Sequence, residues 1–492
     1  MEATRISIWL LALMVLVSCA SPVTELPDGS GGHAAPPIAL SLEVPCADSL
    51  ESVYVEPTDL EAYDASQRGE VVRCAVDRTL SVEQIQQALS DMNVVDIAAN
   101  SAVRVFRIRY RTERLLGQEG MTGALVLLPE KTLAGNVPLV VYGHGGVGDD
   151  PRAAFSRSDP TSSDALNRID AVGALALASY GYPLIAPDFP GFVEGGTPGN
   201  SIAEDEAHSL LDGTRAFKQL VTRGGVSEEV VLVGHSQGGH AVLSAQALAE
   251  SYGLIGRLNA VVPLAPAWYA PRSYAAFLSK GMGFNTTDNA IDITVSLGYL
   301  NSHAEFYDGP GAGLALFQPD KFDELAMFAG SHDPFGSLAI LGHTPYDFMD
   351  PAFLDDVATC ALTSRSEDCS SDRAQTWQKR FRADRPTLDP HGADVLVWQA
   401  ANDLIVRPAL GRCAIDKIQL DLSVAGASAR FTGCGDRDAD HNDLVARNVS
   451  WVARWIDHRT LGGRAPTACP DQAALELDGE TLVCPDPPGN TD

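Results

Sequence analysis

The sequence predicts an α/β fold, in which a mostly parallel β-sheet is covered by helices on both faces. The first observation is that short apolar stretches alternate with helical ones, as expected for buried parallel strands. These stretches are residues 138–142, 184–186, 230–233 and 260–264. The second is that the alternation stops near residue 266 and resumes at residue 394. The third is the length of 492 residues, 45% of them apolar, which suits a large α/β domain with an insertion or a two-domain chain.

The first residues have the pattern of an export signal. Arg5 supplies a positive charge, and residues 6–17 form an apolar run too short to span a bilayer. The tetrapeptide ending at Cys19 resembles the lipobox of bacterial lipoproteins, so residues 1–18 would be removed and Cys19 lipidated. An ordinary signal peptide that contains a cysteine is the alternative. The sequence therefore predicts an exported protein, held at an outer membrane or cell surface only through an N-terminal lipid.

The next segments follow in order. Residues 19–45 are rich in Pro, Gly, Ser and Ala, which predicts a flexible tether. The α/β core is expected over residues 46–265 and 391–492. Within it, residues 103–110 alternate apolar and basic side chains, as a half-exposed strand would. Residues 266–390 break the pattern and are interpreted as a lid or cap over the strand ends, with a separate domain as the alternative.

Charge and cysteine content limit the function further. Acidic residues number 64 against 35 basic ones, a net charge of −29, which argues against nucleic-acid binding through a basic face. Without Cys19, eight cysteines remain, an even number that predicts disulfides in an exported chain. A nearest-neighbour hypothesis among many pairings is Cys46–Cys74, Cys360–Cys369, Cys413–Cys434 and Cys469–Cys484. No CxxC or Cys/His cluster suggests a metal site.

The strongest motif is G-x-S-x-G at residues 234–238. It directly follows the apolar stretch 230–233 and precedes a helical stretch, which is the context of a nucleophile elbow. Glycine permits the sharp turn that would expose the Ser236 hydroxyl. The amide of Gln237, at the start of the helix, would then face the oxygen that becomes negative during acyl transfer. Ser236 is therefore the candidate nucleophile.

A serine nucleophile needs a base, and the base needs an acid. In proteins with a nucleophile elbow the chain order is Ser, acid, His, so both partners are sought after Ser236. Asp403 follows the strand at 395–399 and would lie at the same edge of the sheet as the elbow. His441 precedes the final helix, whereas His391 comes before the acid in the chain. Asp403 and His441 are therefore the candidate acid and base.

A second oxyanion donor is expected in the loop after an early strand. Residues 143–148 read Gly-His-Gly-Gly-Val-Gly, and glycine allows close approach of the backbone to a substrate. The amide of Gly145 or Gly146 is the expected donor, with a turn that binds nothing as the alternative. The loop lacks the phosphate-binding G-x-x-x-x-G-K-[ST] pattern.

Together these residues resemble the α/β-hydrolase superfamily, in particular secretory lipases and related bacterial serine esterases. Residues 186–192, Ala-Pro-Asp-Phe-Pro-Gly-Phe, are similar to a loop of that family, and a helix with Asp212 and Arg215 follows. The resemblance covers about residues 100–460 and implies an α/β-hydrolase fold with a lid over an acyl pocket. The elbow sequence His235-Ser236-Gln237 is shared with general esterases, acyltransferases and some peptidases, which leaves the substrate open.

The expected function is therefore hydrolysis of carboxylic esters, as by a lipase or esterase, through an acyl-enzyme. The substrate would be a small-molecule or lipid ester, and neither a metal nor an organic cofactor is required. A serine peptidase or an acyltransferase of the same fold, and a non-catalytic binding protein, are the alternatives.

Overall fold

The protein is described from a computed structural model. The structure describes residues 36–470 apart from 59, 61, 95, 148–150, 163–167, 193–196, 222–223, 272, 274–288, 324–343 and 362–365. The predicted signal peptide, the lipidation site Cys19 and most of the predicted tether lie outside these residues. Among the described residues, no helix is long and apolar enough to cross a bilayer.

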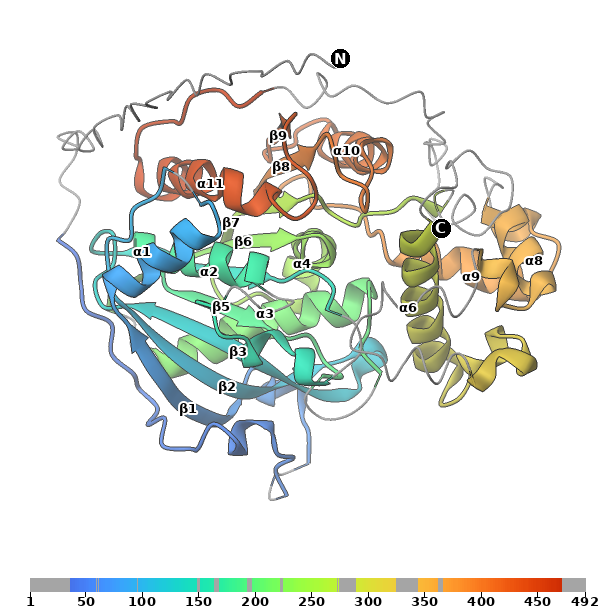
Figure 1. Ribbon diagram of the computed structural model, residues 1–492, viewed down its shortest axis with the longest axis horizontal. Helices are drawn as coiled ribbons and strands as arrows, with labels where there is room; N and C mark the ends of the chain where they lie inside the picture. The colour runs from blue at the N-terminus through green and yellow to red at the C-terminus, as the bar shows by residue number, and fades with distance from the viewer. Residues whose placement is uncertain are drawn as a thin grey trace, which may run out of the picture. The chain divides into compact units, whose positions relative to one another are not determined.

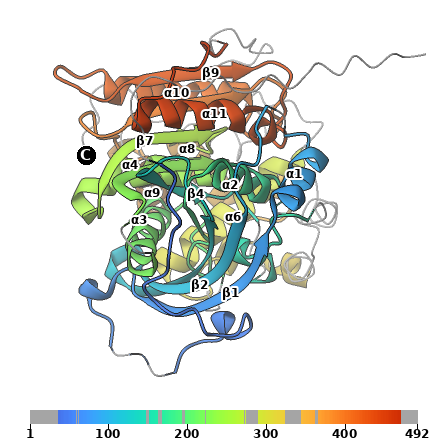
Figure 2. The same cartoon turned by 90° about the vertical axis from the view of Figure 1, so that its left-hand side faces the viewer.

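A nine-stranded sheet runs through the described part of the chain, in the order β1-β2-β3-β5-β4-β6-β7-β8-β9 (Figure 1). The strands are β1 (Val71–Leu80), β2 (Val103–Glu113), β3 (Glu119–Pro129), β4 (Val137–Gly143), β5 (Leu184–Pro187), β6 (Val226–His235), β7 (Arg257–Leu264), β8 (Asp394–Ala400) and β9 (Phe431–Asp436). The pairs from β1 to β5 along this order are antiparallel, and all pairs from β5 to β9 are parallel. β1 and β9 lie at opposite ends of the sheet (Figure 2). The predicted mostly parallel α/β sheet is confirmed.

Helices cover both faces of the sheet. Successive residues of a strand point to opposite faces, and the apolar side chains on each face pack against helices. Val140 and Tyr142 of β4 pack with helices α1 (Val82–Asp91), α2 (Arg168–Tyr180) and α11 (Leu444–Leu461). Leu139 and Val141 pack on the other face with α3 (Ala203–Leu220), α4 (Gln237–Tyr252) and α10 (Pro408–Leu422). Both faces of β4 are therefore buried, which explains its unbroken apolar sequence.

Strand β2 differs from the expectation of a half-exposed strand. Its arginines are buried, with Arg107, Arg109 and Arg111 exposed by only 4%, 0% and 1%. The reason is non-local. Arg107 donates to Asp77 of β1 at 2.7 Å and to the Ser158 carbonyl at 2.8 Å, whereas the chain before β1 supplies acceptors to the other two. Arg109 donates to the Val55 carbonyl at 2.9 Å, and Arg111 donates to the side chain of Gln67 at 3.0 Å. The alternating pattern was correctly assigned to a strand, but its basic side does not face solvent.

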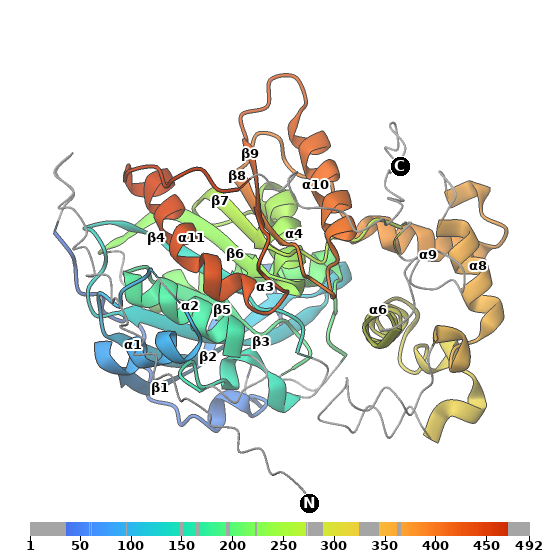
Figure 3. The same ribbon diagram turned by 45° about the horizontal axis from the view of Figure 1, so that its top comes forward.

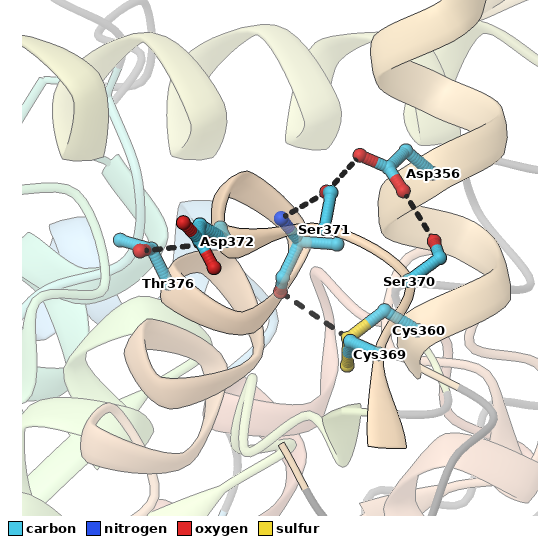
Figure 4. Close-up of a disulfide and its surroundings, with 8 residues drawn as sticks. Asp356, Cys360, Cys369, Ser370, Ser371, Asp372 and Thr376 are labelled. Carbon is cyan, nitrogen blue, oxygen red and sulfur yellow. Dashed lines mark hydrogen bonds between the residues drawn. A yellow bond between two sulfur atoms is a disulfide. The ribbon is translucent and has the colours of Figure 1, made fainter. Parts of the chain in front are cut away.

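Between β7 and β8 the chain forms α6 (Asn289–Asp308), α8 (Pro351–Ala361) and α9 (Asp372–Ala383). In Figures 1 and 3 these helices lie beside α3 and α4, away from α1 and α2. A disulfide between Cys360 and Cys369 joins the end of α8 to the chain before α9 (Figure 4). Nearby, Asp356 of α8 accepts hydrogen bonds from Ser370, at 2.8 Å, and from Ser371, whose hydroxyl caps α9. These links fix the two helices as one unit.

The disulfides confirm two of the expected cysteine pairs and overturn the other two. The structure has Cys46–Cys74, Cys360–Cys369 and Cys434–Cys469. The expected pairs Cys413–Cys434 and Cys469–Cys484 are therefore wrong. The chain after α11 returns along β9, where the Gly435 amide donates to the Pro470 carbonyl at 2.9 Å. Cys413 is also disulfide-bonded, and its partner lies outside the described residues.

Candidate active site

Ser236 lies at the corner between β6 and α4, as the sequence predicts. Its backbone has φ 56° and ψ −116°, a conformation that costs energy for any residue with a side chain. The end of β7 holds this corner in place. The Ser236 amide donates to the Leu264 carbonyl at 2.9 Å, and the Ala267 amide donates to the Ser236 carbonyl at 3.1 Å. A strained strand-to-helix corner of this kind, at a half-buried serine, is the geometry of a nucleophile elbow.

Three glycines bring the elbow against the end of β4. A Cβ atom on Gly238 would lie 1.9 Å from the carbonyl oxygen of Gly143. A Cβ atom on Gly234 would lie 2.1 Å from the carbonyl oxygen of Gly238. No side chain fits at these contacts. The glycines of the motif therefore permit the turn and also place the loop after β4 beside Ser236.

The predicted acid and base are in contact. His441 Nδ1 lies 2.7 Å from Asp403 Oδ2, and both residues are buried. The other carboxylate oxygen of Asp403 accepts from the amides of Ile405 and Val406, each at 2.8 Å, so the carboxylate cannot rotate freely. An Nδ1–H bound to Asp403 leaves Nε2 of His441 free to accept a proton.

The loop that carries His441 lies against the elbow, although 206 positions separate the contacting residues. Nε2 of His235 is 2.9 Å from the carbonyl oxygen of His441, and the two imidazole centroids are 4.7 Å apart. His235 directly precedes Ser236. The structure thus gathers Ser236, Asp403 and His441 at one edge of the sheet, beyond the carboxyl ends of β6, β8 and β9.

The glycine-rich loop also lies at this edge, but one of its amides is already engaged. A Cβ atom on Gly145 would be 3.5 Å from Ser236 Cβ, and one on Gly146 would be 3.0 Å from Gln237 Oε1. The Gly145 amide donates to Asp170 Oδ2 at 2.9 Å. Gly145 is therefore corrected from an oxyanion donor to a fixed support, which leaves Gly146. Gln237 is the first residue of α4, whose first N–H groups have no partner within the helix.

Asp170 and His235 form a buried pair that the sequence interpretation missed. Burial disfavours both charged forms. The charged imidazole of His235 and the Gly145 amide nevertheless hold the pKa of Asp170 below its ordinary value. Asp170 and, more weakly, Asp403 raise the pKa of His235 above its ordinary value. The available signal was an acidic residue in the otherwise apolar helix around residues 169–178.

A second buried polar cluster lies behind Gln237. The amide of the Gln237 side chain donates to Glu206 at 2.7 Å, and Glu206 also lies 2.6 Å from Nδ1 of His240. His240 Nε2 is 2.7 Å from the carbonyl oxygen of Asp384, whose side chain lies 2.6 Å from His303 of α6. This chain of contacts links the start of α4 to the helices between β7 and β8.

A cavity of about 570 Å³ lies elsewhere, between β9 and α11, where Trp451, Trp455 and Phe431 are among its lining residues. None of the lining residues belongs to the candidate active site. Within the described ranges, no group of three or more His, Cys, Asp or Glu side chains is arranged to hold a metal ion.

Comparisons with known proteins agree with this fold. The profile of the alpha/beta hydrolase family matches residues 139–428. Among solved structures, the rice cell wall degrading esterase LipA from Xanthomonas oryzae superposes with a TM-score of 0.58 at 18% identity, covering 80% of this chain and 99% of that one. Candida antarctica lipase A in its closed state gives a TM-score of 0.56 at 17% identity, covering 82% and 85%.

A candidate hydrolase from Legionella pneumophila gives a TM-score of 0.61 at 17% identity, covering 79% of this chain and 98% of that chain. No curated protein sequence matches the chain. At these identities the structural likeness establishes the fold, and the family match extends over more than half of the sequence.

Proposed function

Because this chain belongs to the alpha/beta hydrolase family, we propose that it is a serine hydrolase of carboxylic esters, with Ser236 as nucleophile, His441 as base and Asp403 as acid. The observation that carries the proposal is the 2.7 Å contact between Asp403 and His441, in a loop bonded to the residue before Ser236. The elbow geometry and the order of the three residues along the chain support it.

The chemistry follows from the placement of these groups. His441 takes the hydroxyl proton of Ser236 as the oxygen attacks the ester carbonyl, and Asp403 stabilises the imidazolium that forms. The oxyanion accepts from the amides of Gln237 and Gly146, a contribution of about 3–4 kcal/mol per donor. Collapse expels the alcohol with the proton from His441 and leaves an acyl-enzyme. Water, deprotonated by His441, then releases the acid and restores Ser236.

The ester substrate is proposed from the relatives. One structural neighbour is described as a cell wall degrading esterase and another as a lipase. We extend to this chain only the shared chemistry, an ester of a small molecule or a lipid. Residues 266–390 are proposed to act as a lid, since α6 and α9 belong to this segment and connect through Asp384 and His240 to the first turn of α4.

The location is proposed in two steps. Disulfides such as Cys46–Cys74 indicate an oxidising compartment outside the cytosol. The finer proposal is that Cys19 carries the lipid of a bacterial lipoprotein. Labelling with an alkyne fatty acid tests it: wild-type protein expressed in a bacterial host should take up the label, and Cys19→Ser should not. Equal labelling of the two proteins contradicts the anchor.

The activity is tested with p-nitrophenyl esters whose acyl chains run from two to sixteen carbons. Ser236→Ala should lower kcat by at least about 1000-fold at every chain length, because the nucleophile is lost. The matched control is Ser251→Ala. Ser251 is an exposed serine near the end of α4, the helix that begins after Ser236, and this variant should retain wild-type turnover. A peak at long chains indicates a lipase and a peak at short chains an esterase. Hydrolysis that survives Ser236→Ala refutes the mechanism.

A further inference from the structure

The buried pair of Asp170 and His235 stands at the meeting point of three loops of the candidate site. Asp170 lies in the first turn of α2, and His235 is the last residue of β6. The carboxylate Oδ1 is 3.2 Å from Nδ1 of His235, and the two residues are only 6% and 4% exposed. Neither belongs to the proposed triad.

Each partner reaches a different part of the site. Asp170 accepts from the Gly145 amide at 2.9 Å and from the Tyr142 hydroxyl at 3.0 Å, which ties it to the end of β4 and the glycine loop. His235 donates through Nε2 to the carbonyl of His441 at 2.9 Å, which ties it to the loop of the base. The oxyanion loop, the elbow and the base are therefore joined through one ion pair.

The protonation state follows from the partners of the ring. Both nitrogens of His235 face an oxygen that can only accept, namely a carboxylate and a backbone carbonyl. Nε2–H donates to the His441 carbonyl. Nδ1 makes no hydrogen bond but lies within ion-pair distance of the Asp170 carboxylate, and a carboxylate so close favours the charged imidazolium. The other titratable groups facing this ring are Asp403 and the imidazole of His441. With two carboxylates nearby, the charged form of His235 is compensated.

The physical consequence of this arrangement is orientation. A buried ion pair adds little net stability compared with apolar packing of the same volume. Here, however, it fixes the direction of two backbone groups, the Gly145 amide and the His441 carbonyl. Fixing the Gly145 amide also limits where the next amide, that of Gly146, can point. Displacement of a catalytic group by about 1 Å can lower turnover by about 100-fold.

We propose that Asp170 and His235 act as positioning residues, which set the His441 loop and the Gly145–Gly146 loop with respect to Ser236. This proposal rests on the proposed ester hydrolase function. It assigns no contact with substrate to either side chain. Its effect passes through the backbone of His441 and of the glycine loop.

Two substitutions of His235 separate orientation from general packing. Gln can place an N–H near the position of His235 Nε2 and keep the bond to the His441 carbonyl. Asn is too short to do so. We expect kcat to fall about 10-fold or less in His235→Gln and about 100-fold in His235→Asn, with KM changed less than about 3-fold in both. Equal losses in the two variants, or turnover unchanged in His235→Asn, overturn the proposal.

A second readout does not depend on activity. In a protein labelled with 15N-histidine, the His235 ring should still carry protons on both nitrogens at a pH just above the ordinary histidine pKa of 6.5. Loss of the signal in His235→Gln assigns it. Asp170→Asn should convert this signal to that of a neutral ring and lower kcat about 10-fold or more. A neutral His235 in the wild type overturns the pair. If the doubly protonated signal is present but wild-type protein hydrolyses no ester, the proposed function fails and the positioning role falls with it.

Discussion

Replacing Gly238 with alanine tests how the elbow and the glycine loop are packed together. The new Cβ atom would lie 1.9 Å from the oxygen and 2.2 Å from the carbon of the Gly143 carbonyl, and 2.7 Å from the His144 oxygen. Ordinary contacts begin near 3.4 Å, so the backbone at the end of β4 must retreat by more than about 1 Å. It cannot do so freely because Gly143 is paired with Gly234 of β6.

The cost can be estimated from these distances. Overpacking of side chains costs about 1–3 kcal/mol, and the upper end applies here because every close atom belongs to the backbone. Alanine recovers about 0.5–1 kcal/mol of helix propensity within α4, which leaves a net loss of about 2 kcal/mol in the free energy of unfolding. Movement of the loop after Gly143 also disturbs the Gly146 amide. Loss of one oxyanion donor lowers kcat about 100-fold or more.

The assay compares guanidinium unfolding and p-nitrophenyl ester turnover of wild type, Gly238→Ala and Gly298→Ala. Gly298 lies within α6, where the nearest atom to an added Cβ is 3.7 Å away, so this control should be as stable as wild type or more stable by up to about 1 kcal/mol. Gly238→Ala with wild-type stability and turnover would refute the proposed packing of the elbow against β4.

Three further predictions concern the acid, a disulfide and pH. Asp403→Asn should lower kcat about 10,000-fold with little change in KM, because an uncharged amide replaces the carboxylate that stabilises the His441 imidazolium. Steady-state kinetics check this, and a loss under about 10-fold argues against Asp403 as the acid. Replacing Cys434 and Cys469 by serine should lower the free energy of unfolding by about 4 kcal/mol, since the bond closes a separation of 35 residues; an unchanged denaturation midpoint contradicts this. Burial lowers the pKa of His208 in the folded protein to about 4, so at a pH between about 4 and 6.5 the unfolded chain is protonated at His208 more readily than the folded one. The free energy of unfolding should therefore fall as pH drops from about 6.5 to 4. In His208→Phe the free energy of unfolding, measured with denaturant at each pH, should fall less over this range, by up to about 3 kcal/mol. An unaltered pH dependence would contradict this.

The fold class and the elbow could be predicted because their signals are local. Buried parallel strands read as apolar runs, and the strand, turn and helix around Ser236 occupy consecutive residues. Asp403 and His441 followed from chain order and from their positions after strand ends. A parallel sheet brings such ends to a common edge, so a sequence argument could place them together.

The remaining features depend on segments that meet only in three dimensions. Arg109 and Arg111 of β2 take acceptors from the chain before β1, and nothing in the strand itself signals this cover. Cys434 pairs with Cys469 because the tail returns along β9, although Cys413 is closer in sequence. The Gly145 amide is engaged by Asp170, which belongs to a helix 25 residues later in the chain. Pattern and spacing carry no information on such contacts.

The most direct test of the central claim is covalent capture of the nucleophile. The protein is incubated with a fluorophosphonate, digested, and examined by mass spectrometry. The account predicts a single adduct, on the hydroxyl of Ser236, whose formation slows strongly in His441→Gln and stops in Ser236→Ala. An adduct on another serine, or no adduct on folded wild-type protein that is active toward esters, would contradict it.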